Sequence, residues 1–469
     1  MLPEPAQILA RARSLLRVAR VEPFDEATAE GRSQERYRRI VLSTGASLAG
    51  TAVTTLVGLA IVPLLVSRMG KDFYGLWATV FSLTPWIALL DMGMVGGLVV
   101  AIAEANGRDD REGAAAGFSS AFFSLALAGV LASVALAAVV AFAPWESVVH
   151  LPAGLSRSSV TAGVALVGAV AALSLPLGLV TQAWTGYQKA FVATSFTAGG
   201  SLLSLALLVA AVRLGGSPFA VFAAGSLAGF VAGLASLAFL SRAMPWMRPS
   251  PRRVSRPAFR RLLGTATPLY LFQIGSLLVN QSQRPVLSAS AGLGVTAEYD
   301  LLARIYVLAI TLITVSSASF APTFRESLER GDGEWMRKTF WRLVRLRMAA
   351  AAALCLGIVL GGNAVLRLWL GRQDFQFALP VWLTLAALIL AAVWASPFFE
   401  LLTILDRIWP QVAVVLVQGP LTVGLTWYLG SRYGVLGALL ALVTPTVVVS
   451  GWVIPALAWN TVRTQEVRR

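Results

Sequence analysis

The chain has 469 residues, of which 57% are hydrophobic and 13% charged, and its mean hydropathy is +0.73. This composition excludes water as the main solvent and predicts an all-α integral membrane protein. A single cysteine, Cys355, and a single histidine, His150, exclude a disulfide framework and zinc sites of the cysteine or histidine type.

Apolar stretches that can cross a bilayer recur along the whole chain. A bilayer core about 30 Å thick needs a helix of about 20 apolar residues, because backbone polar groups must be paired inside it. We predict about twelve such helices, six on each side of a basic linker. In chain order they cover residues 40–66, 74–104, 113–143, 158–185, 191–212, 219–241, 264–289, 296–320, 345–361, 380–404, 410–430 and 436–459.

Basic residues predict the orientation of these helices. Of the 38 Lys and Arg residues, 29 lie in the N-terminal segment, the even-to-odd loops and the C-terminal tail, and seven lie in the opposite loops. Short cytoplasmic loops retain Lys and Arg, so both chain ends are predicted to be cytoplasmic. The net charge of +15 is therefore chiefly an orientation signal, with anionic lipid headgroups as secondary contacts and no nucleic acid as partner.

The chain divides into five predicted segments. Within the N-terminal segment, residues 6–21 have the spacing of an amphipathic interfacial helix, and no secretory signal peptide follows. The linker is rich in Pro and Arg, which is typical of a boundary. The predicted segments are the cytoplasmic N-terminal segment 1–39, the N-terminal lobe 40–241, the linker 242–263, the C-terminal lobe 264–459 and the cytoplasmic tail 460–469.

The two lobes show a weak internal likeness. PLLVSRMGKDFY at residues 63–74 resembles PVLSASAGLGVTAEY at residues 285–299, and RLGGSPFA at Arg213 resembles RYGVLGAL at Arg432. Six helices per lobe is an even number, so the repeats share one orientation and are related by an axis along the membrane normal. That is the geometry of a transporter with two lobes.

Two arginines lie inside predicted helices, where a charge is costly unless it faces a polar cavity or a partner. Arg284 and Arg304 each lie ten residues from Gly294, the centre of a helical hairpin turn, so we expect them at matching depth, roughly 10 Å below the outer surface. Asp300 lies one turn from Arg304. Either these two charges satisfy each other, or both guanidinium groups face a central cavity and bind an anionic headgroup.

Asp91 is a second candidate for a cavity residue. Gly93, Gly96 and Gly97 follow it and permit a bend or a close helix approach. One interpretation is a hinge beside a cavity carboxylate, and the other is a capping or interface role for Asp91 near the helix end.

Uncharged residues give two further patterns. Amide side chains inside the predicted helix 264–289 would be costly against lipid, so we expect them to face a lumen. Glycines spaced by four in the predicted helix 219–241 indicate close helix packing. The amides are Gln273, Asn280, Gln281 and Gln283, and the glycines are Gly225, Gly229 and Gly233.

Enzymatic functions lack the residues that they need. His150 stands alone in a predicted outer loop, which argues against a Ser/His/Asp site. GLGVTA at residues 292–297 matches a dinucleotide motif, yet it lies in a hairpin turn without a βαβ unit, so no cofactor and no metal are expected. The longest predicted outer loop, 360–379, is too short for the catalytic domain of a glycosyltransferase or polymerase. We therefore expect a protein that is not an enzyme.

Four segments carry a resemblance to a known family. They are RMGKDFYGLWATVFSL at 68–83 followed by LLDMGMVGGL, GLGVTAEYDLLARIY at 292–306 with Pro322, VLRLWLGRQDFQFALPVW at 365–382, and RYGVLGALLAL at 432–442. In this order they resemble the polysaccharide transporter (Wzx-type) flippases of the multidrug/oligosaccharidyl-lipid/polysaccharide superfamily. The resemblance extends over nearly the whole chain from about residue 38.

The resemblance implies a function and a location. It implies a flippase in the bacterial cytoplasmic (inner) membrane that moves undecaprenyl diphosphate-linked oligosaccharide from the inner to the outer leaflet by alternating access. Such a flippase serves polysaccharide or O-antigen biosynthesis, and its partners are membrane lipids and the polysaccharide assembly machinery. The resemblance also places helices 1, 2, 7 and 8 around a central cavity, which is where Arg284, Arg304, Asp91 and the amides fall.

Two relatives within the superfamily remain alternatives. A lipid II flippase would be expected to have fourteen membrane helices rather than twelve. A cation-coupled multidrug exporter would need buried carboxylates, whereas the predicted intramembrane charges are mainly basic. Relatives often carry an acidic residue near the end of helix 7, where this chain has Gln283, so cation coupling at that position is in doubt.

Overall fold

The computed structural model describes residues 29–142, 151, 155–264, 267–314, 324–327, 330, 332–371 and 375–467. Every regular element in these ranges is a helix, as the sequence predicts. The predicted amphipathic helix at 6–21, His150 and Pro322 lie outside the described residues.

The first six predicted spans correspond to the elements from α2 to α9, which we call the N half. Three of the six predicted spans are single helices that begin and end within a few residues of the prediction. The elements are α2 (Ala29–Met69), α3 (Lys71–Ile87), the 3-10 helix η1 (Ala88–Asp91), α4 (Met94–Gly107), α5 (Arg111–Phe142), α6 (Arg157–Leu173), α7 (Leu175–Gly186), α8 (Ala190–Arg213) and α9 (Pro218–Ala243).

The linker and the C half, which we define as α11 to α18, follow. In the linker, η3 (Pro245–Met247) and η4 (Pro251–Arg253) precede α10 (Arg256–Gly264), which packs on α4 and α5. The helices of the C half are α11 (Thr267–Asn280), α12 (Gln283–Ser290), α13 (Leu293–Thr314), α15 (Gly333–Leu370), α16 (Leu379–Ile404), α17 (Ile408–Pro445), the π-helix η5 (Thr446–Ser450) and α18 (Gly451–Val467).

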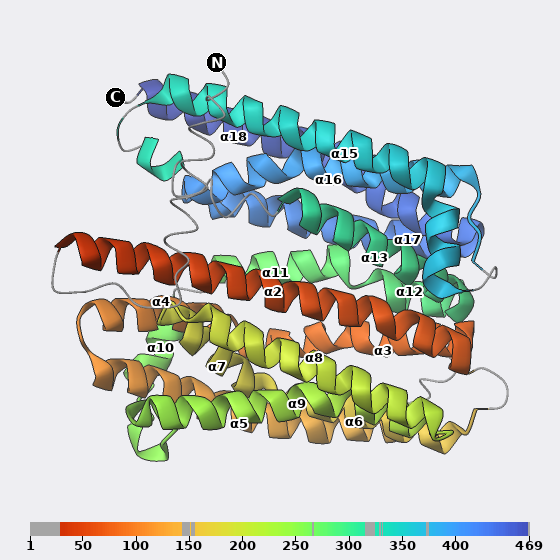
Figure 1. Cartoon of the computed structure of the whole chain (residues 1–469), viewed down its shortest axis with the longest axis horizontal. Coiled ribbons are helices and arrows are strands. Elements are labelled where there is room, and N and C mark those ends of the chain that lie inside the picture. Colours follow the sequence, from red (N-terminus) through yellow and green to blue (C-terminus); the bar gives the residue numbers. More distant parts are fainter. Residues whose placement is uncertain are drawn as a thin grey trace.

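The long helices lie side by side and run between two ends of the bundle (Figure 1). The Gly70 end holds the turn between α2 and α3 and the turn between α12 and α13, and the linker end holds η3, η4 and the turn between α4 and α5. Helices of the N half pack mainly on one another, as do those of the C half, and the halves meet where α3 packs on α12 and α13 and where α2 packs on α15. This is the predicted arrangement of two lobes.

The largest buried apolar cluster lies across this contact between the halves. Leu65 and Phe73 contribute from the N half, and Leu287 and Leu302 contribute from the C half; all four are at most 1% exposed. Burial of this apolar surface stabilises the contact between the halves.

The second predicted span is not one continuous helix, which corrects the sequence prediction. It ends as an α-helix at Ile87, passes through η1, and restarts at Met94 after Met92 and Gly93 adopt the left-handed conformation. Glycine populates this conformation without a steric penalty, which is why the break falls at Gly93.

The predicted spans 158–185 and 264–289 are also divided. Each division is followed by a proline, which cannot donate the helical hydrogen bond to the carbonyl four residues earlier. Pro176 cannot donate to Ala172, and α6 and α7 meet at Ser174 with a bend of 41°. Pro285 cannot donate to Gln281, and α11 ends at Asn280. The predicted continuous spans at 158–185 and 264–289 are therefore wrong in this respect.

The last two predicted spans form a hairpin without a loop. Helical hydrogen bonding continues from Ile408 to Pro445, but Gly434 has φ 57° and ψ −133°, which are not helical, and marks a kink. The chain turns back at this kink, so that the Gln418 side chain on the first arm hydrogen-bonds Thr446, at 3.1 Å, and Ser450, at 2.6 Å, on the second. The predicted boundary at 430–436 coincides with this turn.

Eight helices, or nine with the bent α6–α7 pair, are long and apolar enough to cross a bilayer in the described ranges. The hairpin at Gly434 counts as one of them, and α11–α12 and α13 fall outside the criterion. With the bent pair included there are nine; counting the hairpin as two crossings and adding α11–α12 and α13 gives the predicted twelve. Helix α15 continues to Leu370, so the outer loop predicted at 360–379 is shorter than expected.

Candidate functional site

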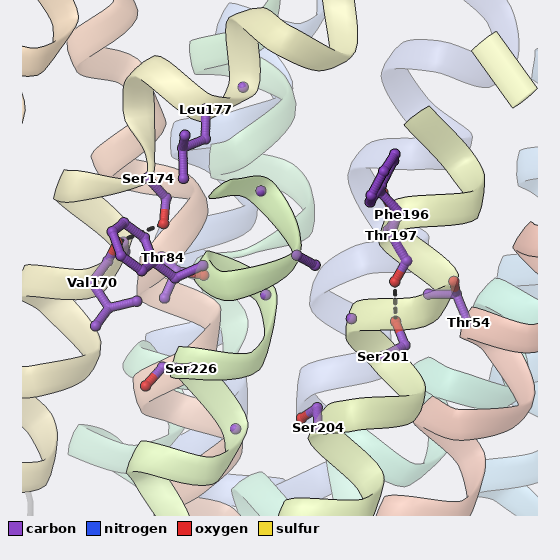
Figure 2. Close-up of a pocket in the computed structure, with 18 of the residues that line it drawn as sticks. Thr54, Thr84, Val170, Ser174, Leu177, Phe196, Thr197, Ser201, Ser204 and Ser226 are labelled. Carbon is purple, nitrogen blue, oxygen red and sulfur yellow. Dashed lines mark hydrogen bonds between the residues drawn. The ribbon is translucent and has the colours of Figure 1, made fainter. Parts of the chain in front are cut away.

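One cavity lies inside the N half and has a volume of about 570 Å³. We call it the N-half cavity; α2, α3, α6, α7, α8 and α9 line it. The described residues that line it include no charged side chain. Its polar groups are hydroxyls, and the side chains that Figure 2 labels among them are Thr54, Thr84, Ser174, Thr197, Ser201, Ser204 and Ser226.

These hydroxyls already use their hydrogen as donors to the backbone. Ser174 donates to the Val170 carbonyl at 2.6 Å, and Ser201 donates to the Thr197 carbonyl at 3.0 Å, as the dashed lines in Figure 2 show. Thr54 and Ser226 donate in the same way to the carbonyls one turn earlier. A hydroxyl that donates keeps two acceptor lone pairs, so the cavity presents acceptors to a ligand.

A second site is built around one carboxylate, and we call it the Asp300 network: Tyr74, Arg284, Asp300 and Arg304. Asp300 is 2% exposed, and it accepts hydrogen bonds from Arg284 Nε at 2.6 Å and from Arg304 Nε at 2.8 Å. The Tyr74 hydroxyl donates to the same carboxylate. Two guanidinium groups and one carboxylate leave the network with a net charge of +1.

The structure thus brings together Arg284, Arg304 and Asp300. The turn itself lies at Ala291–Gly292, and Gly294, its predicted centre, lies inside α13. The structure does not place both guanidinium groups in one cavity. Arg304 Nη1 donates to the Gly58 carbonyl on α2 at 2.7 Å, whereas Arg284 lines a separate cavity of about 130 Å³ in the C half. For Arg304, the structure therefore agrees with the alternative in which it forms an ion pair with Asp300.

The predicted amides do not share one face, because the helix that carries them is broken. Asn280 and Gln281 line the 130 Å³ cavity beside Arg284. Gln283 is fully buried on α12, where its Nε2 donates to the Val279 carbonyl, and Gln273 lines neither cavity. The expectation that Gln283 faces a lumen is wrong in this structure.

Asp91 takes the capping role among its two predicted alternatives. Its side chain is 5% exposed, and Oδ1 accepts a hydrogen bond of 2.7 Å from the backbone N–H of Gly93. Asp91 lines neither cavity. Gly93 lies at the break, whereas Gly96 and Gly97 lie inside α4, so hinge motion there stays a prediction.

Of the three glycines of α9, two pack closely against side chains of other helices and one faces open space. A Cβ atom on Gly225 would lie 2.8 Å from Phe81, and one on Gly233 would lie 2.9 Å from Leu177, as close packing requires. A Cβ atom on Gly229 would meet nothing within 4 Å, and Gly229 lines the N-half cavity. The packing interpretation thus misses Gly229.

Two kinds of functional residue have no clear signal in the sequence. Tyr74 and Gly58 contact Arg304 from helices more than 200 residues away, and no spacing within one helix indicates such a contact. The cavity hydroxyls are spread over several helices, and most of them bond to their own helix, whereas Ser204 on α8 donates to the Ala224 carbonyl on α9. In the described part of the chain, no group of three or more His, Cys, Asp or Glu side chains is placed to hold a metal ion.

Solved structures with the same fold are transporters. An inward-facing multidrug resistance MATE family transporter of the MOP superfamily is 17% identical, with a TM-score of 0.74 over 90% of this chain and 99% of that one. Its outward-facing counterpart is 18% identical, with a TM-score of 0.65 over 92% and 97%. A MOP superfamily transporter from Pyrococcus furiosus, described as having a binding pocket of reverse polarity, is 17% identical, with a TM-score of 0.64 over 92% and 96%.

Sequence comparison identifies the family. No curated protein matches the chain. The family model described as polysaccharide biosynthesis protein matches residues 40–328, which is more than half of the chain. The match begins with the first membrane span and ends after α13, so it includes the N-half cavity and the whole Asp300 network. This multi-pass membrane protein, with the fold of MATE transporters, therefore belongs to the polysaccharide biosynthesis protein family.

Proposed function

We propose that the protein moves a lipid-linked oligosaccharide across the bacterial cytoplasmic membrane, from the inner to the outer leaflet, and is not an enzyme. The observation that carries the proposal is the N-half cavity, which is roomy, uncharged and lined by hydroxyl acceptors. Sugars present many hydroxyl donors, and ligand sites fix orientation with a few placed polar groups. The family and the transporter fold support this assignment.

The lipid diphosphate needs a different environment from the sugar. Arg284 lines the small C-half cavity together with Asn280 and Gln281, which supply a guanidinium group and two amides. Arginine binds phosphate oxygens well because its donors form a fork. We assign the sugar to the N-half cavity and a phosphate group to the Arg284 side, with undecaprenyl diphosphate as the carrier that the family resemblance implies.

A filling substitution in the cavity tests this proposal. Purified protein in vesicles would be supplied with a fluorescent undecaprenyl diphosphate oligosaccharide, and its loss from the quenchable leaflet would be timed. Gly229→Phe places a ring in open cavity space, so we expect at least tenfold slower transport with unchanged folding. Gly199→Phe is the matched control, because Gly199 is exposed on α8 and a Cβ atom there also meets nothing within 4 Å.

A multidrug exporter is the second candidate, because the solved structures with this fold include multidrug transporters. The same vesicles loaded with a cationic dye distinguish the two functions. Dye export without movement of the lipid-linked sugar by the wild type would contradict our proposal. Equal sugar transport by Gly229→Phe and Gly199→Phe would show that the N-half cavity is not the sugar site.

A further inference from the structure

Hydrogen bonds that join the two halves lie between the Gly70 end and the level of Gly58, which is twelve residues before Gly70 on α2. From the C half, Arg304 donates to the Tyr74 hydroxyl at 3.0 Å and to the Gly58 carbonyl, and Trp369 Nε1 donates to the Leu59 carbonyl at 3.0 Å. Lys71 pairs with Glu298 nearer the rim. One further bond joins the Tyr270 hydroxyl to the Leu89 carbonyl. Leu89 lies fifteen residues after Tyr74, which is roughly 22 Å along α3 and η1.

The backbones also approach each other closely at this end. A Cβ atom on Gly75 of α3 would lie 2.0 Å from the Leu293 carbonyl oxygen at the start of α13. Backbone cannot give way as a flexible side chain does, so only glycine permits this contact. The Gly70 end is therefore sealed by packing as well as by hydrogen bonds.

The charges of the network are distributed so that this seal can open. Asp300 and both of its arginine partners belong to the C half, so the buried carboxylate keeps its two counter-ions when the halves separate. A buried charge that loses its partner is strongly destabilising, and this arrangement avoids that cost. The bonds lost on opening are those of the Tyr74 hydroxyl with Asp300 and Arg304, the bonds to the Gly58 and Leu59 carbonyls, and the Lys71–Glu298 pair at the rim. Water can replace these partners.

We propose that these crossing contacts form a latch, which holds the halves closed at the Gly70 end and must open in each transport cycle. Tyr74, Arg304 and Trp369 are its positioning residues, and the latch consists of their bonds to the opposite half together with the Gly75 contact. In the predicted orientation the latch closes the outer side of the protein. The inference rests on transport by movement of two halves and does not depend on the identity of the cargo.

Distance measurement between spin labels tests the latch without any substrate. Cys355 is the only cysteine and is buried, so Cys355→Ser gives a background for labels at Arg68→Cys and Gln376→Cys, two exposed positions at the Gly70 end of opposite halves. In lipid nanodiscs, Tyr74→Phe removes the hydroxyl and keeps the ring. We expect the ratio of long to short label distances to rise about tenfold, since the hydroxyl bonds a carboxylate.

Gly75→Leu provides the second variant, because its side chain cannot fit against Leu293 in the closed state. We expect a folded protein, checked by gel filtration, in which the long distance dominates. Tyr433→Phe is the matched control: Tyr433 lies on α17, is 59% exposed, lines neither cavity and should leave the distance distribution as in wild type.

The outcomes separate this inference from the proposed function. If Gly75→Leu is folded and keeps the short wild-type distance, the latch is wrong, whatever the protein transports. If Gly75→Leu and Tyr74→Phe shift the distances while lipid-linked sugar is not moved by wild type, the latch stands and the proposed cargo is wrong. A shift in Tyr433→Phe equal to that in Tyr74→Phe would also overturn the specific role of the Asp300 network.

Discussion

The N-half cavity and the Asp300 network adjoin at Gly58, which lines the cavity and accepts a hydrogen bond from Arg304, yet the two regions are chemically opposite. The cavity is spacious and lined by hydroxyls without charge, whereas the network is packed, charged and paired at distances below 3 Å. Of these two regions, only the network at the contact between the halves carries charge. The space for a ligand in the N half is left neutral.

This difference separates two tasks, binding of a ligand and docking of the two halves. A neutral cavity binds a glycan through many weak acceptors and releases it readily, because each hydrogen bond contributes only about 1 kcal/mol net. A charged network that is satisfied within one half specifies how the other half docks. Substitutions in the two regions should consequently change different measurements.

Loss of the central carboxylate should have the largest effect. Asp300→Ala leaves two buried guanidinium groups without their counter-ion, so we expect the free energy of unfolding in detergent to fall by about 3–5 kcal/mol. Asp406→Ala is the control, because its ion pair with Arg325 is mostly exposed and should contribute less than about 1 kcal/mol. Equal stability of the two variants would contradict a network that depends on Asp300.

Removal of cavity acceptors should come next, and it should affect affinity rather than stability. In the double variant Thr197→Val and Ser201→Ala, two acceptors are lost, so we expect KM for the lipid-linked sugar to rise about tenfold. The matched control is Thr311→Val on α13, where an exposed hydroxyl makes the same bond to its own helix outside the cavity. A lower rate at unchanged KM would argue against sugar binding here.

Trp369→Phe should have a smaller effect that is confined to the contact between the halves. It removes the N–H that bonds Leu59 and keeps an aromatic ring, so the closed state should lose about 1 kcal/mol. The label pair at Arg68 and Gln376 measures this loss as a larger fraction of long distances. Trp427→Phe, at a 56% exposed tryptophan of α17, serves as control, and an equal shift there would count against the latch.

The rim ion pair should have the smallest effect. The side chains of Lys71 and Glu298 are 35% and 26% exposed, so water screens their attraction, and we expect Lys71→Met to change the closed state by less than about 1 kcal/mol. This difference from wild type should shrink as salt rises from low to about 1 M, because salt screens exposed charges. A larger effect than that of Trp369→Phe would mean that charge at the rim, and not the buried bonds, holds the halves.

Much of the fold follows from the sequence because the bilayer restricts the choices. Apolar length identifies the membrane helices, and the even count on each side of the linker predicts two lobes of like orientation. Membership of one hairpin also explains why Arg284 and Arg304 meet at Asp300, although the turn lies at Ala291–Gly292, seven residues after Arg284 and twelve before Arg304. These are properties of one segment or of neighbours in the chain.

Features that join distant helices are not contained in such local patterns. The crossing partners of Arg304 lie on α2 and α3, and Tyr74 looks from its own helix like any interfacial aromatic residue. The break between α11 and α12 has a signal in Pro285, whose missing N–H leaves the Gln281 carbonyl without its helical donor, but proline is also found inside helices. Tertiary packing decides between these outcomes, and it also moves Gln283 from the predicted lumen into the core.

The turn at Gly434 has a consequence for how the protein is made. The apolar region from Ile408 to Trp459 spans 52 residues, more than twice the length that one crossing needs, and it contains no polar loop that could wait outside the bilayer. Its two arms are joined by one glycine at φ 57°, beside Arg432, which bonds the Tyr428 hydroxyl. We therefore expect the two arms to enter the bilayer together as a hairpin. A residue at position 434 that cannot adopt this backbone conformation should impair insertion as well as the stability of the finished fold.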